Sequence, residues 1–553
     1  MKRHEPFFSL ALFLFCFLLY ANNLKNEFVN YDDWWVVHNE KMLSWHTTSG
    51  FKKLFLGLSK ETRFEHGAEF LPVRDLSASL QYRFFGESPT PYHVVQNILF
   101  STSAVFFFQF LLSLGTSSAA AFLAALVFAA HPIHVESVTW LSGHKDVLSL
   151  FFALLSLWIY AKGRASLAFG IFLLALGSKY LILFLPVLLP PIDRVRGRPM
   201  SIRRYLLFFG ASGATLGLSI YVASIVGYTP LPLGRSISGI LRNVLALFDG
   251  GTSHLIAPLH LQLYYPYEPA VSWLDVRVWR GLAEVIALLA AFTYGWKNRS
   301  IVLIASTLWI AGFLPSLRTT EIHLLADRYL LFPSIGFAIL CGAGLIHLSR
   351  WKGLGVMAPL IAVLLAAATI RQNRVWASSI SLWEHAAYGD RPVQRETWEN
   401  LANVYRDAGN WAEAAATYEQ VIRQAKPGEK KFSEHGFNLG FCQLRLGRSA
   451  AAEDAFRKVV AVDPTSAKGH MNLGIALARQ SKYRDARKSL EKARELDPVN
   501  VEIVFNLARL AVDQQRWRDV RAYIKELDLL APKDARLAQL RAVQFNARDE
   551  SLR

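Results

Sequence analysis

The chain has 553 residues and a formal net charge of +17, and 52% of its residues are hydrophobic. Soluble domains contain roughly 45–50% apolar residues, and the excess here lies before about residue 370, so the composition excludes a single soluble domain and predicts at least two domains. Basic loops that fix membrane topology and meet anionic lipid account for the positive charge, and we therefore expect no nucleic-acid partner.

Eleven apolar segments predict an all-α, polytopic membrane domain over residues 1–375. Several segments are shorter than the roughly 20 residues that a span requires, so they must tilt or include flanking residues. We interpret the first segment as a retained span, because no small-x-small cleavage site precedes Asn22. The segments are 6–22, 92–113, 117–130, 147–161, 166–178, 180–192, 204–227, 277–296, 300–316, 329–348 and 353–370.

Basic clusters on alternate loops predict which ends of the spans are cytoplasmic. Residues 162–164, 194–204, 297–299 and 350–352 carry these Lys and Arg residues, and the positive-inside rule makes their side cytoplasmic. The first outer loop is then 23–91, and the C-terminal part of the chain lies outside as well.

Residues 236–262 leave the span count open. They fit either a re-entrant hairpin or helices on the surface of the domain. Two spans here would leave the later loops on the predicted sides of the membrane, whereas one span would reverse their sides.

A pair of adjacent carboxylates, Asp32 and Asp33, follows the first span and precedes Trp34 and Trp35. A single aspartate at this place would usually begin a loop or cap the next helix. Two like charges beside apolar walls raise the pKa of at least one of them, and a carboxylate with a raised pKa is an effective general base near neutral pH. We predict that one of the two is a catalytic base; the sequence does not separate them.

The same outer loop contains an amphipathic stretch at residues 49–64, with Phe51, Leu54, Phe55 and Leu58 on one face. This pattern predicts a helix. The helix either lies in the membrane interface and lines the entrance for a lipid, or packs as an ordinary amphipathic loop helix.

A second outer loop, HPIHVESVTWLSGHKD (131–146), concentrates ionisable residues between two apolar runs. It could be an ordinary polar loop, but charged groups at a membrane boundary are costly without a function. We expect no metal site, because the loop lacks HExxH-like helical spacing. We predict that it orients the acceptor or holds its own histidines. The candidate residues are His131, His134, Glu136, His144 and Asp146.

Three isolated cations, Arg74, Lys179 and Arg328, are expected near the outer face. Each one alone could snorkel to the interface or set the topology. Their outer position opposes the positive-inside rule, however, and converging Arg and Lys side chains suit the phosphate of a lipid. We therefore predict that these cations bind a donor phosphate.

The C-terminal part contains an internal repeat of 34 residues. Pro464, Pro498 and Pro532 recur at this spacing, and a series of small residues begins at Gly440. Small residues where two helices cross, with Pro where a helix stops, form the tetratricopeptide pattern. We predict an α-solenoid of about four repeats over 397–532, whose stacked helix pairs form a concave groove.

A connector at 376–396 precedes these repeats, and a C-terminal helix or tail at 533–553 follows them. The repeats carry no set of residues of catalytic type, since His435 and His470 stand apart from any nucleophile and the acids alternate with bases as on solvated helices. We expect the repeats to select the acceptor rather than to perform chemistry.

Five motifs precede the repeats, namely NYDDWW, GESPTPYHVVQNIL, HPIHVESVTWLSGHKD, DRYLLFPS and RQNRVWASSISLW, and with the repeats they span most of the chain. Together they resemble the transmembrane and tetratricopeptide-containing (TMTC) proteins, relatives of the protein O-mannosyltransferases. Two departures are visible. The family commonly has Arg before Pro where this chain has Leu71-Pro72 followed by Arg74, and Lys-Glu where it has Lys179-Tyr180.

The resemblance implies a GT-C membrane glycosyltransferase that uses a polyprenyl-phosphate sugar, with mannose as one candidate. In an inverting transfer, Asp32 or Asp33 would take the proton of the acceptor hydroxyl, and Lys179 and Arg328 would stabilise the leaving phosphate. The implied partners are membrane lipid, the lipid-linked donor, and an acceptor protein or peptide in the repeat groove, modified on Ser or Thr. No divalent metal cofactor is expected.

Two alternatives stay open at this point, namely an enzyme that modifies a lipid or a glycan, and a non-catalytic membrane-anchored scaffold. The compartment is also an expectation only. The sole Asn-x-Ser/Thr sequon, at Asn298, falls in a predicted cytoplasmic loop. This favours a bacterial inner membrane with periplasmic repeats over an endoplasmic reticulum membrane with lumenal repeats.

Overall fold

The computed structural model describes residues 5–33, 47–227, 237–263, 265, 272–313, 325–348, 357–389, 394–424 and 430–550. Across these residues the regular secondary structure is helical throughout, as predicted. Trp34 and Trp35 lie outside the described residues. The chain divides into two compact units, Met1–Arg391 and Pro392–Arg553.

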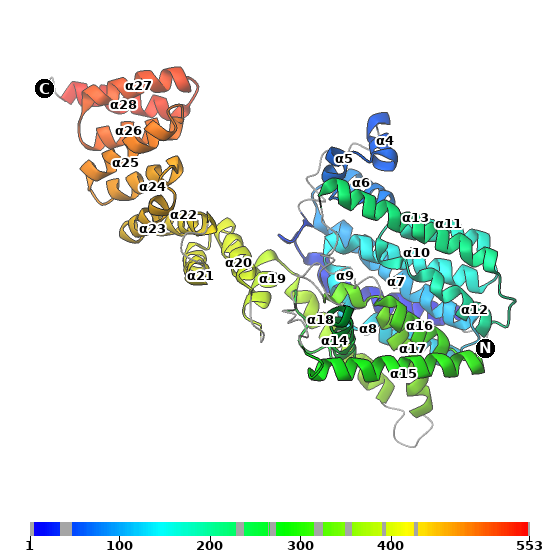
Figure 1. Cartoon of the computed structure of the whole chain (residues 1–553). Coiled ribbons are helices and arrows are strands. Elements are labelled where there is room, and N and C mark those ends of the chain that lie inside the picture. The colour runs from blue at the N-terminus through cyan, green and yellow to red at the C-terminus, as the bar shows by residue number, and fades with distance from the viewer. Residues whose placement is uncertain are drawn as a thin grey trace. The chain divides into compact units, whose positions relative to one another are not determined.

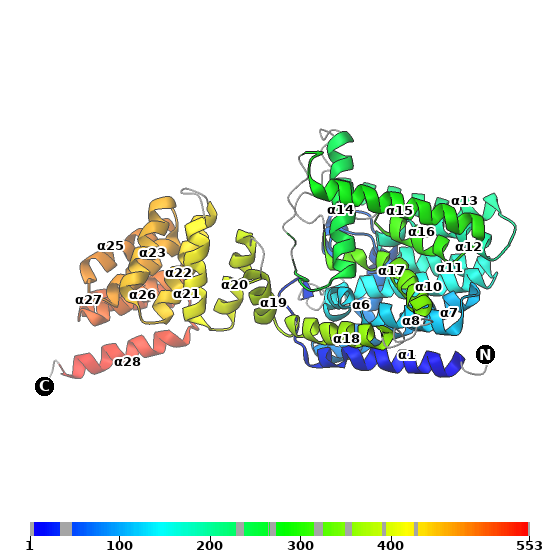
Figure 2. The same cartoon turned by 90° about the horizontal axis from the view of Figure 1, so that it is seen from below.

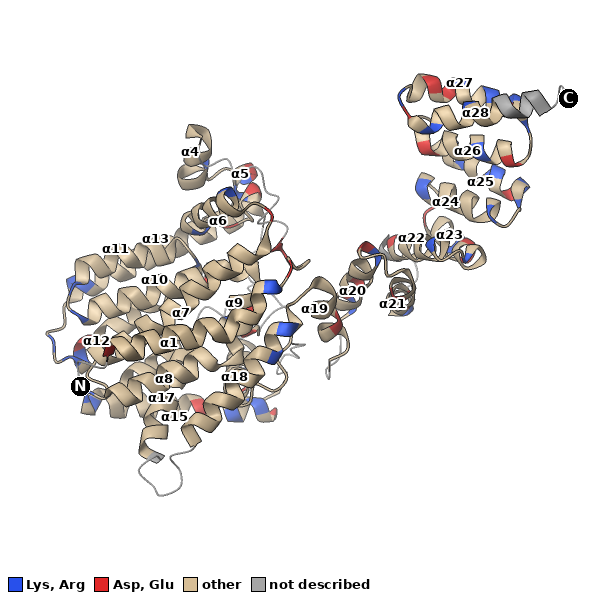
Figure 3. Cartoon of the chain, turned by 180° about the vertical axis from the view of Figure 1, so that it is seen from behind, with Lys and Arg blue, Asp and Glu red and all other residues tan. Residues whose placement is uncertain are grey.

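The first unit is a bundle of apolar helices (Figures 1 and 2). Its main helices are α1 (Glu5–Tyr20), α7 (Pro89–Ser113), α8 (Ser118–Ala130), α10 (His144–Ala161), α11 (Ala165–Leu176), α13 (Ile202–Val226), α15 (Val276–Asn298), α16 (Val302–Gly312), α17 (Pro333–Leu348) and α18 (Met357–Val375). α1 packs on α7 and α18, α10 packs on α7 and α11, and α17 packs on α8 and α16. Figure 3 shows the Lys and Arg residues of this unit mainly near the ends of the helices, which leaves an apolar body between them.

Four stretches of described helix are long and apolar enough to cross a membrane, namely α1, α7, α10 and α13, the first and third with their adjoining short turns. A fifth candidate joins α8 to Pro132–Thr139 across a bend of 51°. The helices α11, α16 and α17 are apolar but shorter. The chain is therefore a membrane protein, as predicted, although these described helices supply fewer full-length spans than the eleven apolar segments suggested.

The predicted span 180–192 is not one helix. It consists of the 3-10 helices η5 (Tyr180–Ile182) and η6 (Leu185–Leu188), followed by the short α12 (Leu189–Val195). Pro186, Pro190 and Pro191 explain the breaks, because proline removes a backbone donor and its ring clashes with the preceding helical turn.

Residues 236–262 form a single amphipathic helix over most of their length, α14 (Ile237–Ile256), rather than a hairpin. The helix packs on α15 and buries Leu245, Leu247, Phe248 and Leu255. The re-entrant alternative is therefore wrong for the part of this segment that the structure describes.

The amphipathic stretch 49–64 forms two helices, α4 (Thr48–Leu56) and α5 (Lys60–Glu65). The second begins at Ser59, whose hydroxyl accepts the Thr62 N–H at 3.3 Å as an N-cap. Leu54 is buried, whereas Phe51 and Leu56 are exposed. The single predicted helix is thus interrupted by a cap in its middle.

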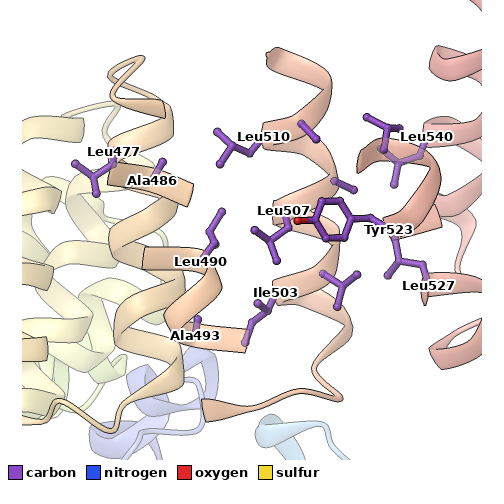
Figure 4. Close-up of a cluster of buried hydrophobic side chains, with 14 of the residues drawn as sticks. Leu477, Ala486, Leu490, Ala493, Ile503, Leu507, Leu510, Tyr523, Leu527 and Leu540 are labelled. Carbon is purple, nitrogen blue, oxygen red and sulfur yellow. The ribbon is translucent and has the colours of Figure 1, made fainter. Parts of the chain in front are cut away.

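The described part of the second unit contains four helix pairs and a final helix, which confirms the tetratricopeptide prediction. The pairs are α20 (Arg395–Asp407) with α21 (Trp411–Gln424), α22 (Lys430–Arg445) with α23 (Ser449–Val462), α24 (Ala467–Ala478) with α25 (Tyr483–Leu496), and α26 (Val501–Asp513) with α27 (Trp517–Leu530), followed by α28 (Ala535–Glu550). Figure 4 shows Leu490 beside Leu507, and Tyr523 between Leu507 and Leu527. A Cβ added at Gly474 would lie 2.7 Å from Leu490, which is why this crossing requires glycine.

Candidate active site

Asp32 and Asp33 occupy very different environments in the turn that follows the first span. Asp33 is 1% exposed, and its Oδ2 and Oδ1 accept the backbone N–H groups of Val29 at 3.0 Å and Ser142 at 2.8 Å. Burial raises the pKa of Asp33 to about 7, although these hydrogen bonds act in the opposite direction. Asp32 is exposed and adopts a left-handed backbone with φ of 66°. The structure thus separates the two carboxylates that the sequence leaves equivalent.

The segment 131–146 connects α8 to α10 through several short turns rather than as a flexible loop. Its elements are η3 (Pro132–His134), α9 (Val135–Thr139) and η4 (Leu141–Gly143). A Cβ at Gly143 would lie 2.8 Å from the carbonyl oxygen of Ser137, so only glycine allows this close return of the chain. That return presents the Ser142 N–H to Asp33.

Glu136 in this segment binds Arg328 twice. The Arg328 guanidinium donates to Oε1, and the Arg328 backbone N–H donates to Oε2 at 2.9 Å. The guanidinium carbon also lies 5.6 Å from the ring centre of Trp140 and 5.0 Å from that of Tyr329, distances that allow cation–π attraction. Arg328 is therefore held against the segment that also anchors Asp33.

Lys179 and Asp146 form an ion pair, in which the ammonium donates to Oδ1. The neighbouring Lys145 binds Glu69 Oε2 at 3.0 Å. Arg328 and Lys145 both repel the Lys179 ammonium, so the three cations lie within electrostatic reach of one another. The side chain of Lys145 is 23% exposed, compared with 10% for Lys179 and 13% for Arg328. Lys145 is not among the residues predicted from the sequence, although it directly precedes Asp146 in the chain.

Arg74 is connected to this group through Glu69, which also binds Lys145. Its guanidinium nitrogens donate to Asp75 at 2.6 Å, to Glu69 at 2.6 Å and to the carbonyl oxygen of His66 at 2.9 Å. Burial disfavours ionisation of Glu69, but the charges of Lys145 and Arg74 outweigh it and lower the pKa of this carboxyl to about 2. Each guanidinium nitrogen of Arg74 is thus engaged inside the protein, and its predicted contact with a donor phosphate stays a prediction.

The three histidines of the segment make internal contacts. His131 Nε2 meets the Leu255 carbonyl oxygen at 2.9 Å, and its Nδ1 accepts the Ile133 N–H at 3.2 Å. His134 is 0% exposed, and its ring centre lies 4.5 Å from that of Phe128.

His144 Nε2 meets Ser77 Oγ at 2.8 Å and Gln81 Nε2 at 3.0 Å. Of the two predicted roles for this segment, the geometry of its histidines therefore fits a structural role rather than contact with the acceptor. Among the described residues, no three His, Cys, Asp or Glu side chains converge as a metal-ligand set.

The C-terminal unit matches two tetratricopeptide repeat family models, over residues 393–465 and 477–543. A protein O-mannosyl-transferase of Caenorhabditis elegans is 24% identical over 68% of this chain and 56% of its own length. Human protein O-mannosyl-transferase TMTC1 is 23% identical over 73% of this chain and 54% of its own length.

Xenopus laevis protein O-mannosyl-transferase tmtc2 is 33% identical over 26% of this chain and 17% of its own length. These comparisons confirm the resemblance to the TMTC proteins. The chain spans about half the length of the first two relatives. Among solved structures, the tetratricopeptide protein YrrB is 15% identical over 34% of this chain and 89% of its own, with a TM-score of 0.26.

Proposed function

We propose, on the premise that its relatives are protein O-mannosyl-transferases, that this chain is a membrane glycosyltransferase of GT-C type. It transfers a sugar, with mannose as the first candidate, from a polyprenyl-phosphate donor to a hydroxyl group on protein Ser or Thr. The observation that carries this proposal is that one predicted base residue and two predicted phosphate ligands all bind the segment 131–146. Asp33 binds Ser142, Arg328 binds Glu136, and Lys179 binds Asp146.

Asp32 is the general base in this proposal. A general base must come within hydrogen-bonding distance of the acceptor hydroxyl, so a candidate is judged first by its accessibility and then by its pKa. Asp32 is exposed, whereas Asp33 is buried with both oxygens held by backbone N–H groups. Asp33 therefore anchors the turn from which Asp32 projects.

The reaction is an inverting displacement. The acceptor oxygen forms a bond to the anomeric carbon while its proton passes to the Asp32 carboxylate. The bond between that carbon and the phosphate oxygen breaks, and its electron pair stays on the phosphate. This leaving group carries charge that preorganised cations stabilise most effectively.

Lys145, Lys179 and Arg328 are the proposed phosphate ligands. Each is already oriented by a carboxylate, so little reorganisation is needed when the phosphate leaves. The most exposed of them, Lys145, is the first to meet the donor. Because these cations supply the positive charge, the proposal needs no divalent metal.

The tetratricopeptide unit binds the acceptor polypeptide in this proposal. It contains a cavity of about 600 Å³ whose lining includes Phe437, Val459 and Val462 together with Glu434 and Lys468. Apolar side chains beside charges of both signs suit a peptide that carries apolar anchors and charged flanks. We place the reaction on the outer face, in the bacterial periplasm, with the lumen of the endoplasmic reticulum as the alternative compartment.

The test is a transfer assay with purified full-length protein, polyprenyl-phosphate mannose and envelope or lumenal proteins as acceptors. Wild-type protein should release polyprenyl phosphate and label Ser or Thr, and the Asp32→Asn variant should do neither. Labelling of glycan or lipid alone would replace the protein acceptor by those alternatives. Full complementation of a deletion strain by Asp32→Asn would favour the scaffold.

A further inference from the structure

The turn at residues 27–33 is hydrogen-bonded to residues 377–383, which belong to the predicted connector 376–396. The N–H of Asn30 donates to Ser379 Oγ at 2.7 Å, and Trp383 Nε1 donates to the carbonyl oxygen of Asn30 at 3.3 Å. The N–H of Glu27 donates to the carbonyl oxygen of Ala377 at 3.0 Å. Ala377, Ser379 and Trp383 belong to the corner where α18 ends and α19 (Ser379–Ala387) begins. We call residues 373–383 the corner.

A network of side-chain amides supports this corner. Asn26 Nδ2 donates to the carbonyl oxygen of Trp376 at 3.0 Å, and Asn373 Nδ2 donates to Asn22 Oδ1 at 2.8 Å. Thr139 Oγ1 donates to Asn373 Oδ1 at 2.6 Å. Asn26, Asn373 and Thr139 are buried, so the network joins the first loop, the second outer loop and the end of α18 in a place where broken hydrogen bonds are costly.

Aromatic rings complete the contact. The ring of Tyr31 lies 4.9 Å from Trp140, 6.1 Å from Trp383 and 6.5 Å from Trp376, measured between ring centres. Trp140, Trp376 and Trp383 are 5%, 3% and 1% exposed. Rings so deeply buried have no free face on which a sugar could stack, so they serve to hold the loop.

We propose that Ser379 and Trp383 are positioning residues that set the place of Asp32 through Asn30. This inference rests on the proposed function of Asp32 as the base. Asn30 is tied to α19 on one side of the turn, and Asp33 is tied to Ser142 on the other. Asp32 is the exposed residue between these two anchors. A displacement of about 1 Å in a reacting group can reduce the rate roughly 100-fold, so loss of one anchor should lower kcat.

The decisive comparison is between Ser379→Ala and Ser381→Ala in the full-length protein. Ser381 hydrogen-bonds within the capping box of the same helix and to the Val375 carbonyl oxygen, so its loss loosens the local structure without removing a first-loop bond. Ser379→Ala should lower kcat by about tenfold or more with an unchanged KM for the donor. Ser381→Ala should keep the wild-type kcat.

Two further variants separate positioning from general stability. Ser379→Thr keeps a hydroxyl and should restore kcat, and Trp383→Phe keeps a ring beside Tyr31 but loses the bond to Asn30, so it should lower kcat. Equal kcat values for Ser379→Ala and Ser381→Ala, or no rescue by Thr, would overturn the inference.

Asp32→Asn is measured in the same series to keep the two proposals apart. If Asp32→Asn is inactive while Ser379→Ala and Trp383→Phe are normal, only the positioning inference fails. If Asp32→Asn is fully active, the proposed base fails whatever the other variants do.

Discussion

The backbone N–H of Ser142 donates a hydrogen bond of 2.8 Å to Asp33 Oδ1, which joins two segments that lie 109 residues apart in the sequence. The first-loop turn therefore depends on the shape of the turn ending at Gly143, where the chain returns too closely for a side chain. Arg328 and Lys179 bind the same segment. A change that moves this segment would displace the proposed base and the phosphate ligands together.

Replacing Asp32 with Asn is expected to reduce transfer by roughly 10²–10⁴-fold, the usual contribution of a general base. Asn adopts the left-handed conformation readily, so the variant should keep its Tm despite the φ of 66° at this position. Transfer rate and Tm are measured on one preparation. A wild-type rate would exclude Asp32 from the chemistry.

The titration of Asp33 should make stability pH-dependent. Its pKa is raised from 3.8 to about 7 in the folded protein by burial, so folding favours the neutral form. This stabilising term is complete below the unfolded pKa and is lost as pH rises through the folded value. Tm should therefore fall between about pH 4 and 7, other groups being equal.

Asp33→Asn is the control for this pH dependence. It should show a lower Tm, because the amide leaves one buried N–H donor unmatched at a cost of about 1–3 kcal/mol. The same variant should show a flatter dependence of Tm on pH. Identical pH curves for wild type and Asp33→Asn would contradict the assignment.

Lys145→Gln is expected to raise the KM for the lipid-linked donor about tenfold, since a charge-assisted contact contributes about 1.5 kcal/mol or more. Lys162→Gln is the matched control, because Lys162 is an exposed lysine at the other end of α10 and lies over Trp158. Donor KM is measured for both variants. Equal effects would indicate a general electrostatic change and remove Lys145 from the proposed site.

Two truncations should behave differently. A chain ending at Arg391 keeps the whole first unit and should still hydrolyse the donor slowly, while transfer to the native acceptor falls through a higher KM. A chain ending at Arg371 lacks Ser379 and Trp383 and should lose donor hydrolysis. Hydrolysis by the shorter chain at the rate of the longer one would show that the corner has no part in the site.

Activity should persist in EDTA, because Lys145, Lys179 and Arg328 supply the positive charge in the proposed reaction. Purified protein is assayed with and without the chelator, and the eluted protein is analysed for bound metal. Loss of activity that manganese or magnesium restores would contradict this prediction.

The sequence predicts the elements of this protein better than their contacts. The tetratricopeptide unit is visible because Pro464, Pro498 and Pro532 recur every 34 residues, with mostly small residues at matching positions between them. The apolar helices are visible from composition. Asp33 and Ser142 have no local signal that joins them, because their contact arises only when two distant loops fold together.

Two features of the structure that differ from our predictions were visible in the neighbouring residues. Asp75 directly follows Arg74 and binds it, so the isolated-cation interpretation of Arg74 overlooked a neighbour. Pro186, Pro190 and Pro191 marked the breaks in the segment that we predicted as one span. The hydrogen bond between Asn30 and Ser379 could not be predicted. The sequence of the connector indicates only a short amphipathic helix and nothing that pairs it with the first loop.

The left-handed backbone of Asp32 has a consequence for attempts to engineer this protein. Asp tolerates this conformation better than most residues with a side chain, but glycine adopts it without steric cost. A library screened for heat resistance alone should therefore enrich glycine at this position, and the most thermostable variants should be inactive. Selection for thermal stability would favour glycine at position 32, whereas selection for catalytic rate would favour aspartate.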